Sequence, residues 1–308
     1  MIEEKLLCAG LDPAEVRRVI ATALAEDLSV GPDVTTLATI PAAMTGRADV
    51  VVKSAGVVAG LVVAEAVFGE VGPQIAVEHK AADGDRVDAG QVLMTVQGPL
   101  QAILTAERTA LNLLTHLSGI ASVTRLWADA VAQGAGRAGR AGRAGSGQAR
   151  VRDTRKTLPG LRALEKYAVR AGCGVNHRMS LGDAALIKDN HVAAAGSVKA
   201  AFEAVRAMAP DLPIEVECDT LEQVTEAVEA GAGLILLDNF SIEQMRSAVE
   251  LVAGRAFLEA SGGLKLEQAS AVAATGVDFL SVGALTHSAP ALDIGLDLVA
   301  SADYPEAG

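Results

Sequence analysis

The sequence predicts an α/β protein whose second half folds into a small barrel of parallel strands. Half of its 308 residues are hydrophobic while only 3% are aromatic, and short apolar runs alternate with helical segments after residue 149. Small aliphatic side chains suit helices that pack closely on buried strands. Strands that alternate with helices form a parallel sheet, and a long succession of such units favours closure into a barrel.

The first hundred residues have a different pattern. An amphipathic helix is expected over 11–27. Four β-rich runs separated by turns follow between 47 and 98, among them GVVAGLVVA and QVLMTVQGP. A second helix is expected from Leu100 to Leu117, with apolar side chains on one stripe. Arg108 falls on the border of this stripe, where its charged group can reach out of the packing.

Residues 134–147, GAGRAGRAGRAGSG, repeat Ala-Gly-Arg three times. This composition cannot bury a core, so we expect a flexible insertion. A basic tether for an anionic partner is the alternative that the composition leaves open.

Six strand-like runs follow the insertion. They are ARVRDT, DAALIK, PIEVEC, GLILLDN, AFLEASGG and VDFLSVGA. A seventh strand is expected around 172–178. Helices between the later strands are expected at 196–209, 220–231, 241–253 and 265–275.

Positive charge is concentrated in one segment of an acidic chain. The formal net charge is −12, which argues against a nucleic-acid partner, because neutralising a phosphate backbone needs a basic surface. Nine basic and three acidic residues nevertheless lie between Arg150 and Lys188. Such a segment indicates a focused site for a small, highly charged anion, although composition alone would favour a solvated basic face.

Polar or glycine residues occupy the carboxyl ends of five successive strands. They are Lys188, Glu217, Asp238, Ser261-Gly262-Gly263 and Gly283. In a parallel barrel these ends meet at one mouth, where active sites form. Glu217 and Asp238 are hard oxygen ligands suited to Mg²⁺ shared with substrate phosphates, and SGG, expected to open a helix, would expose backbone N–H groups to a phosphate. Taken singly, Asp238 is compatible with a helix cap and Glu217 with a solvated surface, but five coincident strand ends favour a site.

Nothing in the chain predicts a membrane segment or an export signal. The longest apolar runs have strand length, and the start MIEEKLLCAG is acidic where a signal peptide is basic. Cys8, Cys173 and Cys218 lack metal-ligand spacing and are interpreted as ordinary thiols. We therefore expect a cytoplasmic protein with no membrane or nucleic-acid partner.

Several segments resemble the quinolinate phosphoribosyltransferase family. The longest is DTRKTLPGLRALEKYAVRAGCGVNHRMSLGDAALIKDNH, at 153–191. EDLSVGPDVTT, TAERTALNLLTHLSGIAS, IEVECDTLEQ, LILLDN, LEASGG and LSVGALTHSAPALDIGLD resemble the same family in order and position. The resemblance covers the chain apart from the Ala-Gly-Arg insertion.

The resemblance implies a two-domain subunit. Residues 1–117, joined by the C-terminal tail 290–308, would form an N-terminal open-faced α/β sandwich, and residues 118–289 a seven-stranded parallel α/β barrel. It implies homodimers, or hexamers built from dimers, with active sites shared between subunits. The implied reaction converts quinolinate and phosphoribosyl pyrophosphate (PRPP) into nicotinate mononucleotide, pyrophosphate and CO₂, with Mg²⁺ as cofactor. Related type II phosphoribosyltransferases are the alternative: nicotinate phosphoribosyltransferase, or the paralogue linked to molybdenum transport.

The same resemblance assigns roles to individual residues. For quinolinate it implies Arg108 from the neighbouring subunit together with Arg155, Lys156, His177, Arg178 and Lys188. For PRPP it implies Lys156, Glu217, Asp238, Ser261, Gly262, Gly263, Gly283 and Ala284. Lys156, Glu217 and Asp238 are expected to be catalytic, and the two carboxylates to hold Mg²⁺. A lone histidine is usually structural, but the place of His177 between Asn176 and Arg178 favours a donor to a substrate carboxylate.

Overall fold

The computed structural model describes residues 2–135 and 149–299. The chain divides into two compact units, of which unit 1 comprises 1–123, 158–173 and 288–308, and unit 2 comprises 124–157 and 174–287. The predicted insertion lies outside the described residues from 136 onward, as does the tail beyond 299. In the described ranges, no helix combines the length and the apolar character that crossing a bilayer requires.

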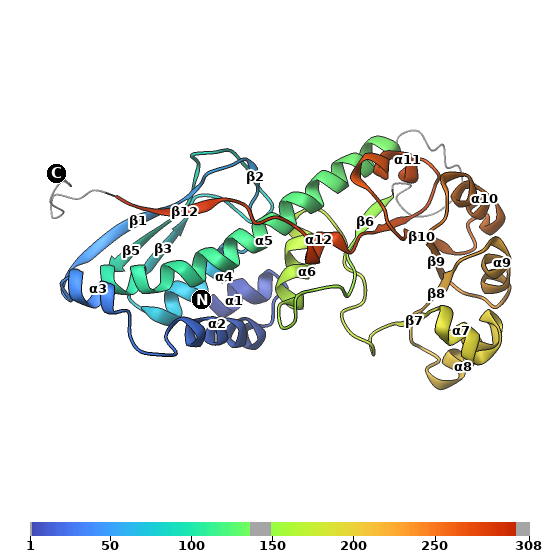
Figure 1. Cartoon of the computed structure of the whole chain (residues 1–308), viewed down its shortest axis with the longest axis horizontal. Coiled ribbons are helices and arrows are strands. Elements are labelled where there is room, and N and C mark those ends of the chain that lie inside the picture. Colours follow the sequence, from blue (N-terminus) through green and yellow to red (C-terminus); the bar gives the residue numbers. More distant parts are fainter. Residues whose placement is uncertain (1, 136–148, 300–308) are drawn as a thin grey trace. The chain divides into compact units, whose positions relative to one another are not determined.

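Unit 1 is built on an antiparallel sheet. Its helices are α1 (Ile2–Cys8), α2 (Pro13–Asp27), α3 (Val34–Thr39), α4 (Leu61–Val71), α6 (Arg162–Ala171) and the first part of α5 (Leu100–Ala135). Its strands are β1 (Thr45–Val52), β2 (Gly56–Val57), β3 (Ala76–His79), β4 (Arg86–Val87), β5 (Val92–Pro99) and β12 (Ile294–Leu298). The sheet order β12-β1-β5-β3 sets β12, from the end of the chain, beside β1, while β2 and β4 form a separate pair (Figure 1).

The run 56–64, expected to be β-rich, is a strand only at its first two residues and is helical from Leu61 onward. β2 ends at Val57, and Gly60 then adopts a φ of +100° at the N-cap of α4. The first three residues of α4, Leu61, Val62 and Val63, are all buried. A helix that begins with a run of buried apolar residues has the same local sequence pattern as a buried strand, so the β prediction holds at Gly56–Val57 and is wrong from Leu61 onward.

The helix expected to carry the apolar stripe from Leu100 to Leu117 is α5, which continues to Ala135, over 36 residues. Its predicted stripe faces the core, since Leu100, Ile103 and Leu114 are buried. Gly119 explains how another segment can cross this helix closely, because a Cβ there would lie 2.1 Å from the carbonyl oxygen of Pro290. A glycine therefore lets the chain pass against α5 on its way to β12.

Unit 2 is a succession of strands and helices. Its strands are β6 (Arg150–Arg152), β7 (Ala185–Ile187), β8 (Ile214–Cys218), β9 (Leu234–Asp238), β10 (Phe257–Ser261) and β11 (Phe279–Ser281). Its helices are α7 (Asp189–Ala195), α8 (Val198–Met208), α9 (Leu221–Glu229), α10 (Ile242–Val252), the 3₁₀ turn η1 (Leu266–Gln268), α11 (Ala269–Ala273) and α12 (Ala284–His287). All six strands were predicted, as were the helices between the later ones.

The six strands form one parallel sheet in the order β6-β11-β10-β9-β8-β7. Val175 extends it beyond β6 through a parallel bridge to Arg152, in the segment where a seventh strand was expected. The Val175 N–H donates to the carbonyl of Val151 at 2.9 Å. Among the described residues no strand pairing joins Val175 to β7, so the hydrogen bonding of the expected seven-stranded barrel is open at this seam.

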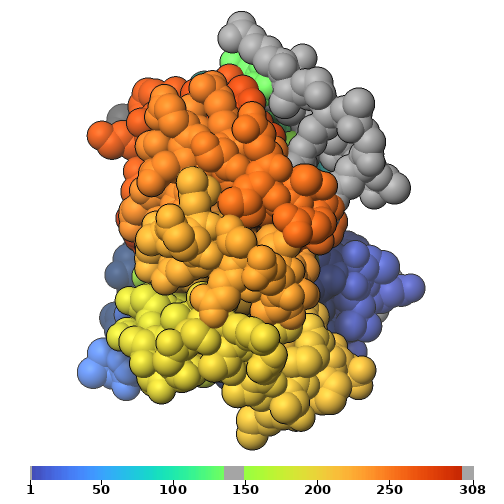
Figure 2. Space-filling view, turned by 90° about the vertical axis from the view of Figure 1, so that its right-hand side faces the viewer, coloured from blue at the N-terminus to red at the C-terminus, as the bar shows by residue number. Residues whose placement is uncertain are grey.

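The helices of unit 2 begin where the sequence supplies capping side chains. Ser197, Thr220 and Ser241 each accept a hydrogen bond from the backbone N–H three residues later, which satisfies a donor that the first helical turn leaves unpaired. The helices α7 to α10 lie on the outer side of strands β7 to β10 (Figure 1). Figure 2 shows their outer surface, yellow at α7 and α8 and orange further along the chain.

The segment Leu158–Cys173, which contains α6, groups with unit 1 rather than with the barrel residues that precede and follow it. Buried polar contacts hold it there. The ring of His116 lies 2.9 Å from the Glu165 carboxylate, and the hydroxyl of Tyr167 donates to Asp83. Arg170 also donates to the carbonyl of Ala9 at 3.1 Å. The boundary therefore differs from the continuous barrel domain that the sequence suggested.

Candidate active site

A cavity of about 670 Å³ lies at the carboxyl ends of the parallel strands of unit 2. Its lining includes every predicted site residue of this unit: Arg155, Lys156, His177, Arg178, Lys188, Glu217, Asp238, Ser261, Gly262, Gly263, Gly283 and Ala284. Arg108, the remaining predicted residue, is exposed on α5 in unit 1. Thr154 and His287 also line the cavity, although the sequence analysis did not single them out. The volume suits a small-molecule ligand.

The two predicted carboxylates lie on neighbouring strands and each has a protein partner. Glu217 on β8 accepts a hydrogen bond from Lys188 Nζ at 2.6 Å. Asp238 ends β9, in register with Ser261 of β10, and accepts from the side-chain amide of Asn239 at 2.7 Å. These bonds engage one oxygen of each carboxylate, so each retains a second oxygen as a ligand for a cation.

The Ser261-Gly262-Gly263 loop adopts a conformation that requires glycine. Gly262 and Gly263 have φ values of +89° and +57°, a region that side chains disfavour. A Cβ on Gly262 would lie 2.3 Å from Asn239 Oδ1, whereas one on Gly263 would meet open space. The sequence analysis expected this loop to open a helix, but the 3₁₀ turn η1 begins only at Leu266. Any phosphate site here therefore depends on loop N–H groups rather than on a helix terminus.

Four cationic side chains line the cavity: Arg155, Lys156, Arg178 and Lys188. The backbone of Lys156 is fixed on both sides, since its N–H donates to Thr154 Oγ1 at 3.0 Å and its carbonyl accepts from Thr286 Oγ1 at 2.7 Å. Arg155 Nε is buried and has no hydrogen-bond partner within the described ranges. Burial, together with the charge of Arg155, lowers the pKa of Arg178. Cations held this close together favour an anion that contacts several of them.

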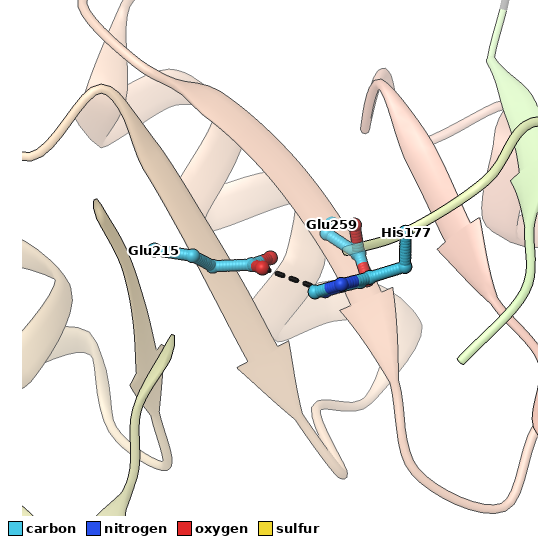
Figure 3. A group of neighbouring side chains, drawn as sticks. All are labelled: His177, Glu215 and Glu259. Carbon is cyan, nitrogen blue, oxygen red and sulfur yellow. Dashed lines mark ion pairs between the residues drawn. The ribbon is translucent and has the colours of Figure 1, made fainter. Parts of the chain in front are cut away.

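His177 uses both ring nitrogens for protein contacts. Nδ1 accepts a hydrogen bond from the backbone N–H of Arg178 at 2.7 Å, and Nε2 lies 2.7 Å from Glu215 Oε2 (Figure 3). A nitrogen that accepts an N–H bond carries no proton, so the ring is neutral and Nε2–H is its donor. The sequence analysis expected His177 to donate to a substrate carboxylate; in this structure that donor points to Glu215.

A layer of ionisable side chains lies deeper in unit 2 than the residues at the strand ends. We call His177, Glu215 and Glu259 the buried layer, and the residues that line the cavity at the strand ends the strand-end layer. Glu215 precedes Glu217 by two positions on β8, and Glu259 precedes Ser261 by two on β10, so each pair shares one face of its strand. The sequence analysis missed both glutamates, although this spacing is visible in IEVEC and LEAS.

Burial dominates the electrostatics of the buried layer. It raises the pKa of Glu215 to about 7, against the opposing charges of Arg152 and Arg178. Burial and the charge of Glu215 also raise the pKa of Glu259. Glu259 Oε2 pairs with Arg152 Nη1 at 2.5 Å. The candidate ligand atoms of the three residues lie within 4.8 Å of one another. The layer could therefore hold either a proton or a cation between its carboxylates.

Comparison with known proteins identifies the family. The models described as "Quinolinate phosphoribosyl transferase" match this chain twice, the N-terminal domain over 33–118 and the C-terminal domain over 131–297. The chain belongs to the quinolinate phosphoribosyltransferase family. The two matches together extend into both units and include all of the predicted site residues.

Individual relatives support this membership. A nicotinate-nucleotide pyrophosphorylase [carboxylating] of Mycobacterium leprae is 53% identical over 289 residues, covering 92% of this chain and 96% of the relative. A chloroplastic protein of the same name from Arabidopsis thaliana is 40% identical, covering 92% and 83%. The crystal structure of NadC from Streptococcus pyogenes matches with a TM-score of 0.85 at 39% identity, covering 94% of this chain and 99% of that one.

A more distant likeness extends to the fold alone. Human nicotinic acid phosphoribosyltransferase matches with a TM-score of 0.59 at 13% identity, covering 85% of this chain and 72% of that one. The architecture of this family is thus shared with an enzyme whose name specifies a different pyridine substrate. The choice of substrate must come from the side chains of the cavity.

Proposed function

We propose that this chain is a quinolinate phosphoribosyltransferase. It transfers the phosphoribosyl group of PRPP to the ring nitrogen of quinolinate, with loss of CO₂, and forms nicotinate mononucleotide and pyrophosphate. The observation that carries the proposal is the composition of one cavity, which combines four cationic side chains with two carboxylates and a glycine loop. The four cations, which we call the cationic half, match a dicarboxylate; the two carboxylates and the glycine loop, which we call the other half, match a phosphorylated sugar.

The cationic half suits quinolinate. This substrate carries two adjacent carboxylates, and each needs a charged partner once water is displaced. Arg155 Nε is buried without a hydrogen-bond partner among the described residues, and burial with the charge of Arg155 lowers the pKa of Arg178. A bound anion would stabilise the charged form of both side chains. Lys156 and Lys188 complete the set. A monocarboxylate such as nicotinate would leave part of this charge uncompensated.

The other half suits PRPP and its metal. Glu217 and Asp238 fit Mg²⁺ in donor type, because hard carboxylate oxygens that line the same cavity as the phosphates are its usual protein ligands. When bound, the metal would offset the charge of the departing pyrophosphate. Ser261, Gly262 and Gly263 contribute loop N–H groups to a phosphate, as does the segment at Gly283. A Cβ on Gly283 would lie 2.9 Å from Lys156 Cδ, so glycine leaves room for that lysine.

The reaction follows from these placements. Pyrophosphate leaves C1 of the ribose with the electron pair of the C–O bond, and the negative side chains of Glu217 and Asp238 stabilise the positive charge that develops there. The pyridine nitrogen attacks C1 and becomes cationic. The 2-carboxylate then departs as CO₂, its bonding electrons remain on the ring carbon next to the cationic nitrogen, and that carbon takes up a proton. Lys156, whose backbone is fixed on both sides, is the cation that we assign to the shared region of both substrates.

We extend the proposal to the assembly and the compartment. Arg108 is exposed on α5 and absent from the cavity lining, so we assign it to the quinolinate site of a neighbouring subunit in a homodimer or a dimer-based hexamer. Within the described ranges no disulfide joins Cys8, Cys173 or Cys218, and cysteines without disulfides are typical of a reducing compartment such as the cytoplasm.

Product stoichiometry tests the activity. The purified chain, PRPP and Mg²⁺ would be offered quinolinate labelled at the 2-carboxylate or, in a parallel reaction, nicotinate. We expect pyrophosphate and labelled CO₂ in equal amounts with quinolinate, and negligible pyrophosphate with nicotinate. Pyrophosphate release with nicotinate and none with quinolinate would reassign the chain to the alternative enzyme.

A further inference from the structure

His177 connects the proposed quinolinate site to the buried layer, because its ring contacts both Arg178 and Glu215. His177 is buried, with only 8% of its side chain exposed, and its main chain and ring are both held. Its backbone N–H donates to Asp153 Oδ1 at 2.7 Å, and the neighbouring Asn176 amide donates to Asp153 Oδ2 at 2.6 Å. The ring joins Arg178 N–H on one side to Glu215 on the other.

Glu215 is the acceptor that orients this ring. Its Oε2 lies 2.7 Å from His177 Nε2, whereas Glu259 Oε1, the second carboxylate facing the ring, lies 3.8 Å away (Figure 3). A hydrogen bond forms at the first distance and not at the second. With Glu215 accepting at Nε2, the proton stays on that nitrogen and Nδ1 is left as an acceptor for Arg178 N–H.

The contact at Nδ1 bears directly on the pocket. It fixes the backbone of Arg178 at the start of its side chain, and Arg178 Nη1 is in turn held by the carbonyl of Ala184 at 2.8 Å. The Arg178 side chain is therefore restrained at both ends, at its backbone and at its guanidinium. A preorganised cation binds its anion more tightly, because less conformational freedom is lost on binding.

We propose that Glu215 is a positioning residue for quinolinate recognition, acting through the ring of His177 on Arg178. It contacts His177 and lies outside the cavity lining. Without it, the Nε2–H of His177 would lose the acceptor that lies 2.7 Å away, and the other carboxylate oxygen facing the ring is Glu259 Oε1 on β10, at 3.8 Å. Movement of the ring toward that carboxylate would withdraw Nδ1 from Arg178. The inference rests on the proposed function, since it concerns how the same cavity binds quinolinate.

Three variants separate positioning from general stability. Glu215→Leu fills the site but removes the acceptor, Glu215→Gln keeps an oxygen acceptor without the charge, and Glu215→Asp keeps the charge but withdraws it by one methylene. Glu259→Gln is the matched control, because it removes a charge from the same layer and leaves the Glu215–His177 contact in place.

The readouts are quinolinate affinity by calorimetry without PRPP, the separate KM values for quinolinate and PRPP, and the ¹⁵N shifts of the His177 ring. Glu215→Leu should weaken quinolinate binding by about tenfold or more, because the buried Nε2–H of His177 loses its hydrogen-bond acceptor. The KM for PRPP should stay within about threefold of wild type. Glu215→Gln and Glu259→Gln should bind quinolinate nearly as wild type does, with the Nε2–H tautomer retained in the first. Glu215→Asp should lie between these results, and it decides the question if Glu215→Leu does not fold.

Two outcomes are distinguishable. If wild-type protein does not bind quinolinate, the proposed function fails. If wild type binds it and folded Glu215→Leu or Glu215→Asp binds it equally well with the same His177 tautomer, the positioning role is overturned. Equal weakening of quinolinate and PRPP affinity would also overturn it, because it would indicate a general disturbance of the barrel mouth.

Discussion

The strand-end layer and the buried layer of unit 2 occupy the same strands but differ in whether their carboxylates reach the cavity. Among the described residues, Glu217 and Asp238 each have one oxygen engaged, and both line the cavity. Glu215 and Glu259 also each have one oxygen engaged and one without a hydrogen-bond partner in the described ranges, but both are buried and absent from the cavity lining. Residues two positions apart on one strand can thus be given different tasks: we propose that the outer ones bind ligands and that the inner ones hold the site in place.

The largest expected effect is on turnover, at the carboxylates of the strand-end layer. Glu217→Ala and Asp238→Ala should each lower kcat by about 10²–10³-fold. Each removes a negative charge near the positive charge that develops on the ribose, and each removes a ligand of the proposed metal. Quinolinate affinity should change little in Asp238→Ala, which leaves the Lys188–Glu217 pair in place, and calorimetry would check this. Glu222→Ala, at an exposed glutamate on α9, is the control and should leave kcat unchanged. A comparable loss of quinolinate affinity in Asp238→Ala would mean that this carboxylate serves the other substrate.

The cations of the strand-end layer should control quinolinate binding. Arg155→Ala or Lys188→Ala should cost about 2–5 kcal/mol of binding free energy, since a desolvated carboxylate would lose its partner. Titration of quinolinate into each purified variant measures this directly. Lys199→Ala, at an exposed lysine on α8, should bind as wild type does. Unchanged affinity in both cavity variants would remove the basis for assigning the dicarboxylate to this half of the cavity.

The buried layer should reveal itself in the pH dependence of stability. The pKa of Glu215 is raised by burial from 4.5 to about 7, so between these values the folded protein holds a proton that the unfolded chain has released. The contribution of Glu215 to the free energy of unfolding should therefore fall as pH rises through this window, by about 3 kcal/mol in total. Denaturant unfolding of Glu215→Gln should lack this decline.

The matched control for this measurement is Glu222→Gln. Glu222 is exposed and its pKa is lowered by hydrogen bonds at the start of α9, so its titration lies below the window. This variant should follow the wild-type pH profile, and a Glu215→Gln profile parallel to wild type would show that Glu215 titrates normally in the folded protein.

The smallest expected signal comes from complementation between subunits. This experiment adds Arg108, which lies in unit 1, to the comparison of the two layers of unit 2. Mixing inactive Arg108→Ala with inactive Lys156→Ala should restore about a quarter of wild-type activity, because half of randomly mixed dimers are mixed and one of their two sites is intact. Subunit exchange would be verified with differently tagged chains. No recovery after confirmed exchange would mean that each site is built from one chain.

The strand-end layer could be predicted from the sequence because its residues follow recognisable local patterns. Each strand of unit 2 was visible as a short apolar run, and polar residues followed at Lys188, Glu217 and Asp238, where parallel strands end together. The helices expected at 220–231 and 241–253 begin in the structure at capping residues Thr220 and Ser241. These features depend on neighbours in sequence, so a single chain suffices to predict them.

The buried layer was not predicted because its contacts join residues that are far apart in the sequence. Glu215 and Glu259 meet His177 only after β8 and β10 join one sheet with the loop that precedes β7, and neither has a partner close in sequence. The His177 tautomer likewise follows from two atoms that the sequence does not bring together. The prediction at the start of α4 failed for a different reason. The apolar run at Leu61 is equally compatible with a strand until the left-handed conformation of Gly60 is known.

A crystal structure of the chain with quinolinate would test the division between the two layers most directly. The account predicts both substrate carboxylates within hydrogen-bonding distance of the cavity cations, Arg155 and Arg178 among them. It also predicts that His177 keeps its contacts with the Arg178 N–H and with Glu215. Quinolinate bound away from these cations, or His177 Nε2 turned from Glu215 onto a substrate carboxylate, would contradict it.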